Sequence, residues 1–365
     1  MSDPKRIVVI GGGIIGLLTA RELRRSGNEV TVLDRQAVGM ESSWAGGGIL
    51  SPLYPARYPE AVRALARWSQ DRYAALCDEL AGTCGVDPEY QRSGLIARDR
   101  LHAHDIASGW HGTIRHIQPD ELKLIEPKIA WGDDPALLMD DIAQVRNPRL
   151  LRALVADLTR LGVRIEAGCQ VRGFKIMRGR LTGIEAAADT IATDCCVVAA
   201  GAWSADLLRP TGLDLPIEPV CGQMLLFRCP RPMLSRIVMD GDFYLIPRRD
   251  GRTLVGSTIE RTGFEKQTTE TARALLFEQA TRIVPALVDC EVEAHWAGLR
   301  PGSPDGVPFI GRHPSVAGLY VCAGHYRNGL VLAPASARLM ADLVLDRPPI
   351  LDPQAFVPER QAIAN

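Results

Sequence analysis

IVVIGGGIIGLLTARELRRSGNEVTVLD, residues 7–34, is the stretch that decides the fold. Its first four residues are apolar and predict a strand that is buried on both faces. Three glycines follow with the spacing G-x-G-x-x-G, then a helical stretch that ends at Gly27, then a second apolar strand that ends at Asp34. Strand, glycine turn, helix and strand together predict a βαβ unit that binds a dinucleotide.

Each glycine of this turn has a separate physical reason. Gly11 permits the tight turn out of the strand, Gly13 has no Cβ to block a pyrophosphate, and Gly16 lets the helix lie close to the sheet. The N-terminus of the helix offers free N–H groups and a partial positive charge to phosphates. Asp34 can accept hydrogen bonds from an adenosine ribose and would repel a 2′-phosphate.

Two other interpretations of this stretch are weaker. A glycine-rich turn without function leaves Asp34 unexplained. A signal peptide is suggested by Lys5 and Arg6 before the apolar run, but the glycines break that run, Arg21 and Glu22 follow it, and no small-residue cleavage site is present. No stretch supplies the roughly 20 apolar residues of a transmembrane helix.

The composition sets broad limits on the protein. Its 365 residues allow about two domains, and a net charge of −1 gives no sign of binding to nucleic acid or to an anionic membrane. The nine cysteines are scattered and odd in number, which indicates a reducing, cytoplasmic location and no disulfide framework. Four histidines close in sequence lack a carboxylate or cysteine at ligand spacing, so no metal site is predicted: His102, His104, His111 and His116.

The rest of the chain alternates between two kinds of structure. Buried strands and helices that continue the β–α pattern are predicted at 147–161, 163–166, 195–200, 319–323 and 330–345, with Asn147 as the N-cap of the first helix. Strands of antiparallel character are predicted at 216–228, 243–255 and 292–300, with a hairpin turn at Asp250–Gly251. The residues after Pro353 are expected to form a loose tail.

These elements predict an α/β fold with a discontinuous Rossmann-like dinucleotide-binding domain. An α+β substrate domain, built on an antiparallel sheet, is inserted into it, and a ligand cleft is expected between the two. The dinucleotide-binding domain is predicted to comprise residues 1–85, 145–212 and 300–365, and the substrate domain residues 86–144 and 213–299.

Two further segments are candidates for ligand contact. The run from Glu41 to Ile49 is too rich in glycine for a helix interior, and it directly follows the ribose-binding acid, so we prefer a cofactor-binding loop to a flexible surface loop. A second strand–glycine–helix corner lies at residues 199–204, and two such corners in one sheet can hold one dinucleotide from two sides.

Arg300, Arg327, Tyr244 and His325 are the candidates for chemistry in the cleft. Arg300 ends an apolar strand, and its planar guanidinium matches a carboxylate; the alternative is a structural ion pair, for example with Asp305. Arg327 lies among glycines, where a second cation is costly unless an anion binds. Tyr244 can donate from its hydroxyl or can simply be a core tyrosine, and His325 can contact the cofactor.

Seven motifs carry a resemblance to a known family. They are GGGIIG (11–16), ESSWAGGGI (41–49), QVRNP (144–148), AAGAWS (199–204), YLIPR (244–248), WAGLRPG (296–302) and GHYRNGLVLAP (324–334). Through them nearly the whole chain resembles the FAD-dependent D-amino-acid oxidase family, and within it the members that oxidise glycine for thiamine biosynthesis. The last two motifs are the most specific.

The resemblance implies noncovalent FAD and assigns roles to residues. Arg300 would clamp the substrate carboxylate, Tyr244 would hydrogen-bond the same group, and Arg327 would lie at the boundary between substrate and flavin. Asp34 departs from the glutamate common in the family, which affects the detail of the ribose contact. The other residues expected at the cofactor are Gly11, Gly13, Ile14, Ile15, Gly16, Arg35, Ser42, Ser43, Gly46, Gly47, Gly48, Ile49, Val171, Ala200, Gly201, Trp203, His325, Tyr326, Asn328, Gly329 and Leu330.

The resemblance also implies the reaction and the partners. Glycine, or a small D-amino acid or sarcosine, would lose a hydride to flavin N5, and oxygen would reoxidise the flavin to give hydrogen peroxide. A homo-oligomer and a functional link to thiazole synthase are implied; a nucleic acid or membrane partner is not. The alternatives are a D-amino-acid dehydrogenase that reduces a quinone, a sarcosine-type secondary-amine oxidase and a non-enzymatic flavin redox sensor.

Overall fold

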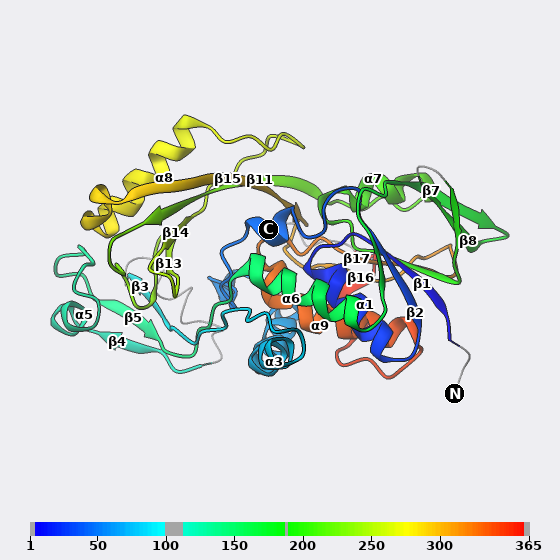
Figure 1. Ribbon diagram of the computed structural model, residues 1–365, viewed down its shortest axis with the longest axis horizontal. Helices are drawn as coiled ribbons and strands as arrows, with labels where there is room; N and C mark the ends of the chain where they lie inside the picture. The colour runs from blue at the N-terminus through cyan, green and yellow to red at the C-terminus, as the bar shows by residue number, and fades with distance from the viewer. Residues whose placement is uncertain (1–3, 99–111, 187–188, 361–365) are drawn as a thin grey trace.

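The computed structural model describes residues 4–98, 112–186 and 189–360, and its elements form two large sheets that lie apart (Figure 1). The first sheet has six strands in the order β16-β17-β10-β1-β2-β6, and all neighbours are parallel except β16 and β17. Its strands are β1 (Arg6–Ile10), β2 (Glu29–Leu33), β6 (Arg164–Glu166), β10 (Cys195–Val198), β16 (Phe309–Arg312) and β17 (Leu319–Ala323).

Strand β1 lies inside this sheet and is buried on both faces, as its apolar run predicts. Ile7 and Val9 belong to the core formed with the helices, whereas Val8 and Ile10 face a second core. The helices of the first core are α1 (Ile14–Arg25), α3 (Glu60–Cys84), α6 (Asn147–Arg160) and α9 (Gly329–Val344). The second core includes side chains of a three-stranded sheet made of β7 (Val171–Met177), β8 (Arg180–Ala186) and β9 (Thr190–Ala192).

The second large sheet has eight strands in the order β15-β11-β14-β13-β12-β3-β5-β4, and only β12 and β3 pair in parallel. Its strands are β3 (Leu95–Arg98), β4 (Arg115–Ile117), β5 (Ala136–Met139), β11 (Glu218–Arg228), β12 (Ile237–Asp240), β13 (Phe243–Pro247), β14 (Thr253–Gly256) and β15 (Glu291–Gly302). Helix α8 (Glu270–Ile283) packs on it through Leu276 and Ile283. The predicted fold class, a Rossmann-like sheet combined with an antiparallel sheet, is confirmed.

The shorter helices complete the chain. The α-helical ones are α2 (Ser42–Ala45), α5 (Pro119–Ile125) and α7 (Ser204–Leu208). The 3-10 turns are Pro55–Arg57, Gly201–Trp203, Arg209–Thr211, Pro285–Asp289, Tyr326–Asn328 and Pro353–Phe356. No helix among the described residues is both long and apolar enough to cross a membrane.

Several local predictions are wrong. Helix α1 begins at Ile14, so the glycine motif itself enters the helix. Arg146, not Asn147, precedes α6 as its N-cap, and the Asn147 amide instead donates to the Ser43 carbonyl oxygen at 2.8 Å. The expected loose tail is ordered as far as residue 360, because Phe356 is buried and Arg360 pairs with Asp305 at 2.6 Å.

Two of the nine cysteines are paired. Seven cysteines are free, as the composition predicts, but Cys229 and Cys290 form a disulfide between the end of β11 and the start of β15, which it did not predict. The domain boundaries at residues 85, 145, 212 and 300 stay a prediction, and β15 continues through the last of them. Of the four histidines, only His116 lies in the described residues, and these contain no cluster of side chains that suits a metal ion.

Candidate functional site

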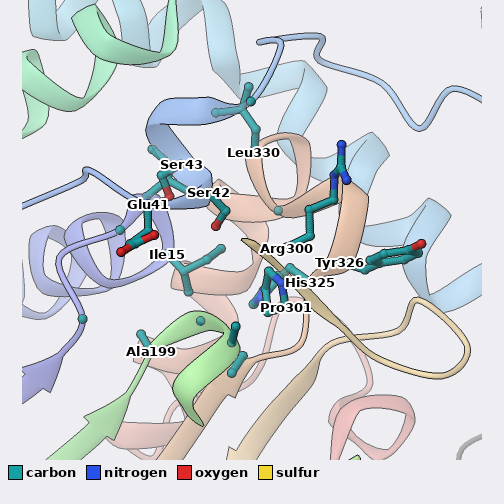
Figure 2. Close-up of a pocket in the computed structure, with 18 of the residues that line it drawn as sticks. Ile15, Glu41, Ser42, Ser43, Ala199, Arg300, Pro301, His325, Tyr326 and Leu330 are labelled. Atoms are coloured by element: carbon teal, nitrogen blue, oxygen red, sulfur yellow. Dashed lines mark hydrogen bonds between the residues drawn. The ribbon is translucent and has the colours of Figure 1, made fainter. Parts of the chain in front are cut away.

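A cavity of about 580 Å³ lies where the carboxyl ends of β1, β10 and β17 meet β13 and β15 of the antiparallel sheet. Figure 2 shows Ile15, Ser42 and Ser43 on one side of this space and Arg300, His325 and Tyr326 on the other. Every site residue predicted from the sequence lines this cavity except Gly16. The structure therefore brings together residues that lie far apart in the chain, from Gly11 to Leu330; their roles stay a prediction.

The glycine turn after β1 leaves no room for a side chain. Gly11 has φ +107°, and a Cβ there would lie 2.3 Å from the Ala199 carbonyl oxygen. A Cβ on Gly16 would lie 1.8 Å from the Gly11 carbonyl oxygen, so Gly16 serves the packing of helix on strand and not the cavity wall. Gly13 lines the cavity directly before α1, where the helix N-terminus presents its N–H groups.

Asp34 lies at the end of β2 and is held by the backbone. Its two carboxylate oxygens accept from the Gly12 N–H at 2.8 Å and the Gln36 N–H at 2.9 Å. Each oxygen keeps a further lone pair. The aspartate side chain, which is shorter than the glutamate common in the family, is therefore held in place and can still accept hydrogen bonds from a ligand in the cavity. Next to it, the Arg35 guanidinium stacks on the Trp203 ring at 3.6 Å.

The loop from Gly46 to Ile49 passes between the two sheets. Gly48 has φ +87°, and a Cβ there would lie 2.1 Å from the Val145 carbonyl oxygen. A Cβ on Gly47 would lie 2.8 Å from Cδ1 of Ile246. The glycines therefore allow the backbone to pass closely between neighbouring segments, and the same residues line the cavity.

Arg300 lies on β15, and its hydrogen bonds to the described part of the chain all go to neutral oxygens. Within the described residues, Nη2 donates to the Ser257 hydroxyl at 2.8 Å, and Nη1 donates to the carbonyl oxygens of Thr258 at 3.2 Å and Cys221 at 3.4 Å. Burial and the nearby Arg327 cation lower the pKa of Arg300. The alternative ion pair with Asp305 does not form, because the Asp305 carboxylate pairs with Arg360. This cation therefore suits an anion that enters the cavity.

Tyr244 is buried on β13 and lines the same cavity. Its hydroxyl faces Sδ of Met224 at 3.7 Å, a weak acceptor that leaves the hydroxyl able to bind a ligand. Four further residues line the cavity and were not predicted from the sequence as site residues: Ser257, Tyr54, Tyr58 and Asn147. Asn147 belongs to the motif QVRNP (144–148), which could have indicated a role in the site. The other three residues lie in no motif that indicates one.

His325 is 2% exposed, and its Nε2 lies 3.0 Å from the Ser336 hydroxyl on α9. Burial lowers the pKa of His325 to about 3. The charged imidazolium therefore forms only below that pH, and the ring is neutral near pH 7. It is suited to hold a partner by hydrogen bonding and not to exchange protons during turnover.

We expect His325→Asn to leave the pH profile of kcat/KM unmoved between about pH 5 and about pH 9, because the wild-type imidazole does not titrate there. The measurement is the initial rate at limiting substrate across that range for both proteins. A wild-type inflection near pH 6 that disappears in the variant would show that His325 does titrate.

The chain was compared with known proteins. The model of a family described as "DAO: FAD dependent oxidoreductase" matches residues 6–343. A glycine oxidase of Pseudomonas putida is 48% identical over an alignment of 364 positions, which covers 97% of this chain and 98% of that protein. A protein of Synechocystis sp. described as "Bifunctional protein ThiO/ThiG" is 35% identical over 99% of this chain and 54% of that protein. A crystal structure of glycine oxidase from Geobacillus kaustophilus matches with a TM-score of 0.92 at 28% identity, covering 98% of this chain and 100% of that one.

Proposed function

Because the chain belongs to the DAO family of FAD-dependent oxidoreductases, we propose that it is a glycine oxidase. It converts glycine, oxygen and water to glyoxylate, ammonia and hydrogen peroxide: glycine is oxidised to the imine as oxygen is reduced to peroxide, and water then hydrolyses the imine. The structural observation that carries this proposal is the guanidinium of Arg300, which lines the cavity together with Tyr244 and has no carboxylate partner in the described chain. A small amino acid supplies the carboxylate that this cation lacks.

The residues present fit FAD. Gly13, Gly46 and Gly47 have no Cβ on the cavity wall, and the α1 N-terminus presents N–H groups of the kind that bind a pyrophosphate. Asp34 keeps acceptor capacity for a ribose, and Val171 lines the cavity near it. We assign the cofactor contacts to the residues predicted from the sequence, with Gly16 acting through the packing of α1.

The residues of this chain position the substrate for the chemistry that bound FAD supplies, which is acceptance of a hydride from the α-carbon. Arg300 binds the carboxylate, and its attraction is strengthened because the half-buried guanidinium is partly desolvated. The Tyr244 hydroxyl donates to the same carboxylate. Since His325 is neutral and buried, it is not a general base for the α-carbon, and orientation supplies most of the rate.

The cavity and the related proteins support a small amino acid as the substrate. The same cavity has to hold the flavin together with the substrate, which supports glycine, sarcosine and small D-amino acids over large ones. A place in thiamine thiazole synthesis is supported by the ThiO/ThiG relative, whose name joins two activities in one chain. We also propose a cytoplasmic location, which seven free cysteines favour and the Cys229–Cys290 disulfide does not, and a homo-oligomer, as the family resemblance implies.

The test is a steady-state panel of glycine, sarcosine, D-alanine and L-alanine, with oxygen uptake and peroxide release recorded together. Equal oxygen uptake and peroxide release with glycine support an oxidase. Turnover only with a quinone acceptor would identify a dehydrogenase instead, and a strong preference for sarcosine would identify a secondary-amine oxidase. A flavoprotein that turns over none of these amines would overturn the proposal.

A further inference from the structure

Arg248, directly after β13, is a half-buried cation that donates to three neutral oxygens. Its Nη1 donates to Oε1 of Gln144 and to the Val145 carbonyl oxygen, each at 3.0 Å, and its Nη2 donates to the Gly47 carbonyl oxygen at 2.7 Å. The nearby acids Glu89 and Asp250 are paired with Arg146. Burial, and then the Arg146 cation, lower the pKa of Arg248 to about 10, so it is charged at neutral pH.

The bonds around Gly47 fix the orientation of the cavity loop. The Gly47 carbonyl points to Arg248, and the Gly48 carbonyl accepts from the Val145 N–H at 2.9 Å. Because C=O and N–H point in opposite directions in a trans peptide, the N–H groups of Gly48 and Ile49 face the other way. The φ of +87° at Gly48 lets two successive carbonyls turn to one side.

The cavity lies on the side to which these N–H groups point. Gly47, Gly48 and Ile49 all line it, whereas Arg248 and Val145 do not. Two successive backbone N–H groups that point the same way form a concave donor pair that favours negative charge. The loop therefore presents an anion-stabilising surface to the cavity, and the Gly47 carbonyl is the point at which a side chain holds it.

One face of β13 supports this arrangement. Tyr244, Ile246 and Arg248 are two residues apart along β13 and the residue that follows it, so their side chains lie on the same face. All three contact the loop at Gly47. A Cβ on Gly47 would lie 3.1 Å from Cε2 of Tyr244 and 2.8 Å from Cδ1 of Ile246. The first two side chains supply packing, and Arg248 supplies the hydrogen bond that sets the direction of the peptide.

We propose that Arg248 is a positioning residue: by holding the Gly47 carbonyl, it keeps the Gly48 and Ile49 N–H groups directed at the flavin and favours the negatively charged reduced ring. The proposal rests on FAD as the cofactor and does not depend on which amine is oxidised. Arg248 would lower the free energy of the negatively charged reduced flavin, and turnover rates report on that free energy only indirectly.

The test uses purified holoenzyme and sulfite, which donates its sulfur lone pair to flavin N5 and leaves the negative charge on the ring. We expect Arg248→Met to raise the sulfite Kd by about tenfold and to lower the flavin reduction potential. Arg248→Lys, whose single ammonium cannot reach three acceptors in the same geometry, is expected to give an intermediate value. Both quantities are read from the flavin spectrum without an amine substrate, so failure of the proposed glycine activity would leave this test intact.

Two control variants separate positioning from stability. Gln144→Leu removes one acceptor of Arg248 but leaves its bond to Gly47, so it is expected to lower the Tm while keeping the wild-type sulfite Kd. Arg249→Met removes a neighbouring exposed arginine that pairs with Asp87 and is expected to change neither. A sulfite Kd for Arg248→Met within twofold of the Gln144→Leu value would overturn the proposal. If Arg248→Met does not fold, a wild-type sulfite Kd for Arg248→Lys would overturn it.

Discussion

Replacing Arg300 with alanine is expected to lower kcat/KM for glycine by about 100-fold or more, mainly through a higher KM. The loss of one partner from a buried, hydrogen-bonded charge pair typically costs about 2–5 kcal/mol. Arg300 approaches this case because it is half-buried, and within the described chain its bonds go only to Ser257, Thr258 and Cys221. Without it, the substrate carboxylate enters a cavity that has lost its closest cation. The measurement is the dependence of peroxide release on glycine concentration.

Two further variants make this prediction specific. Arg300→Lys keeps the charge but loses the planar pair of donors, so its kcat/KM is expected to fall between those of wild type and Arg300→Ala. Arg261→Ala removes an exposed arginine that pairs with Glu218 and is expected to leave KM unchanged. A KM for Arg300→Ala within about twofold of wild type, in protein with a normal flavin spectrum, would contradict the assigned role.

Gly11→Ala is expected to yield protein with little bound FAD and an FAD Kd raised by at least about 100-fold. The added Cβ would lie 2.3 Å from the Ala199 carbonyl oxygen and 3.0 Å from Cα of Ala200, so two backbone segments would have to separate. The φ of +107° adds strain for any residue with a Cβ. Both effects act at the turn between β1 and α1, and both distort the cavity wall. The measurement is the ratio of flavin to protein absorbance after purification, followed by titration with FAD.

The matched control is Gly82→Ala in α3. No atom lies within 4 Å of the added Cβ, and alanine favours a helix more than glycine does, so the FAD content is expected to stay normal and the Tm to rise slightly. Full FAD occupancy and a wild-type FAD Kd in Gly11→Ala would show that the turn tolerates a side chain, against the structure.

The sequence predicted the fold best where local pattern and tertiary position agree. The run from Ile7 to Ile10 is apolar throughout because β1 has a core on each face, and this feature is visible in the sequence itself. The Asp250–Gly251 turn was likewise predictable, since it joins β13 to β14 and Gly251 has φ +83°. The order of strands in the second sheet was not, because β3 pairs with β12 across some 140 residues of chain.

The candidate site was predictable through its glycines and its arginines. A glycine weakens a helix or strand, and an arginine in an apolar segment needs a partner for its charge, so both residue types at these positions indicate a function. Other lining residues escaped because their roles arise only from three-dimensional contact. Ser257 is an ordinary serine in the sequence, yet its hydroxyl accepts from Arg300. Asn147 has the pattern of an N-cap, but its amide donates to Ser43 because α2 packs against α6. Arg248 stood in a quoted motif without a role, since its partner Gly47 lies 201 residues away in the chain.

Whether the protein is an FAD-dependent glycine oxidase is tested by the absorbance of the purified holoenzyme, first mixed with glycine without oxygen and then exposed to air. The account predicts that the yellow flavin bleaches on addition of glycine, and that air restores the colour with release of one peroxide for each flavin reoxidised. A yellow protein that glycine does not bleach would contradict the account, and bleaching without peroxide on admission of air would contradict its assignment as an oxidase.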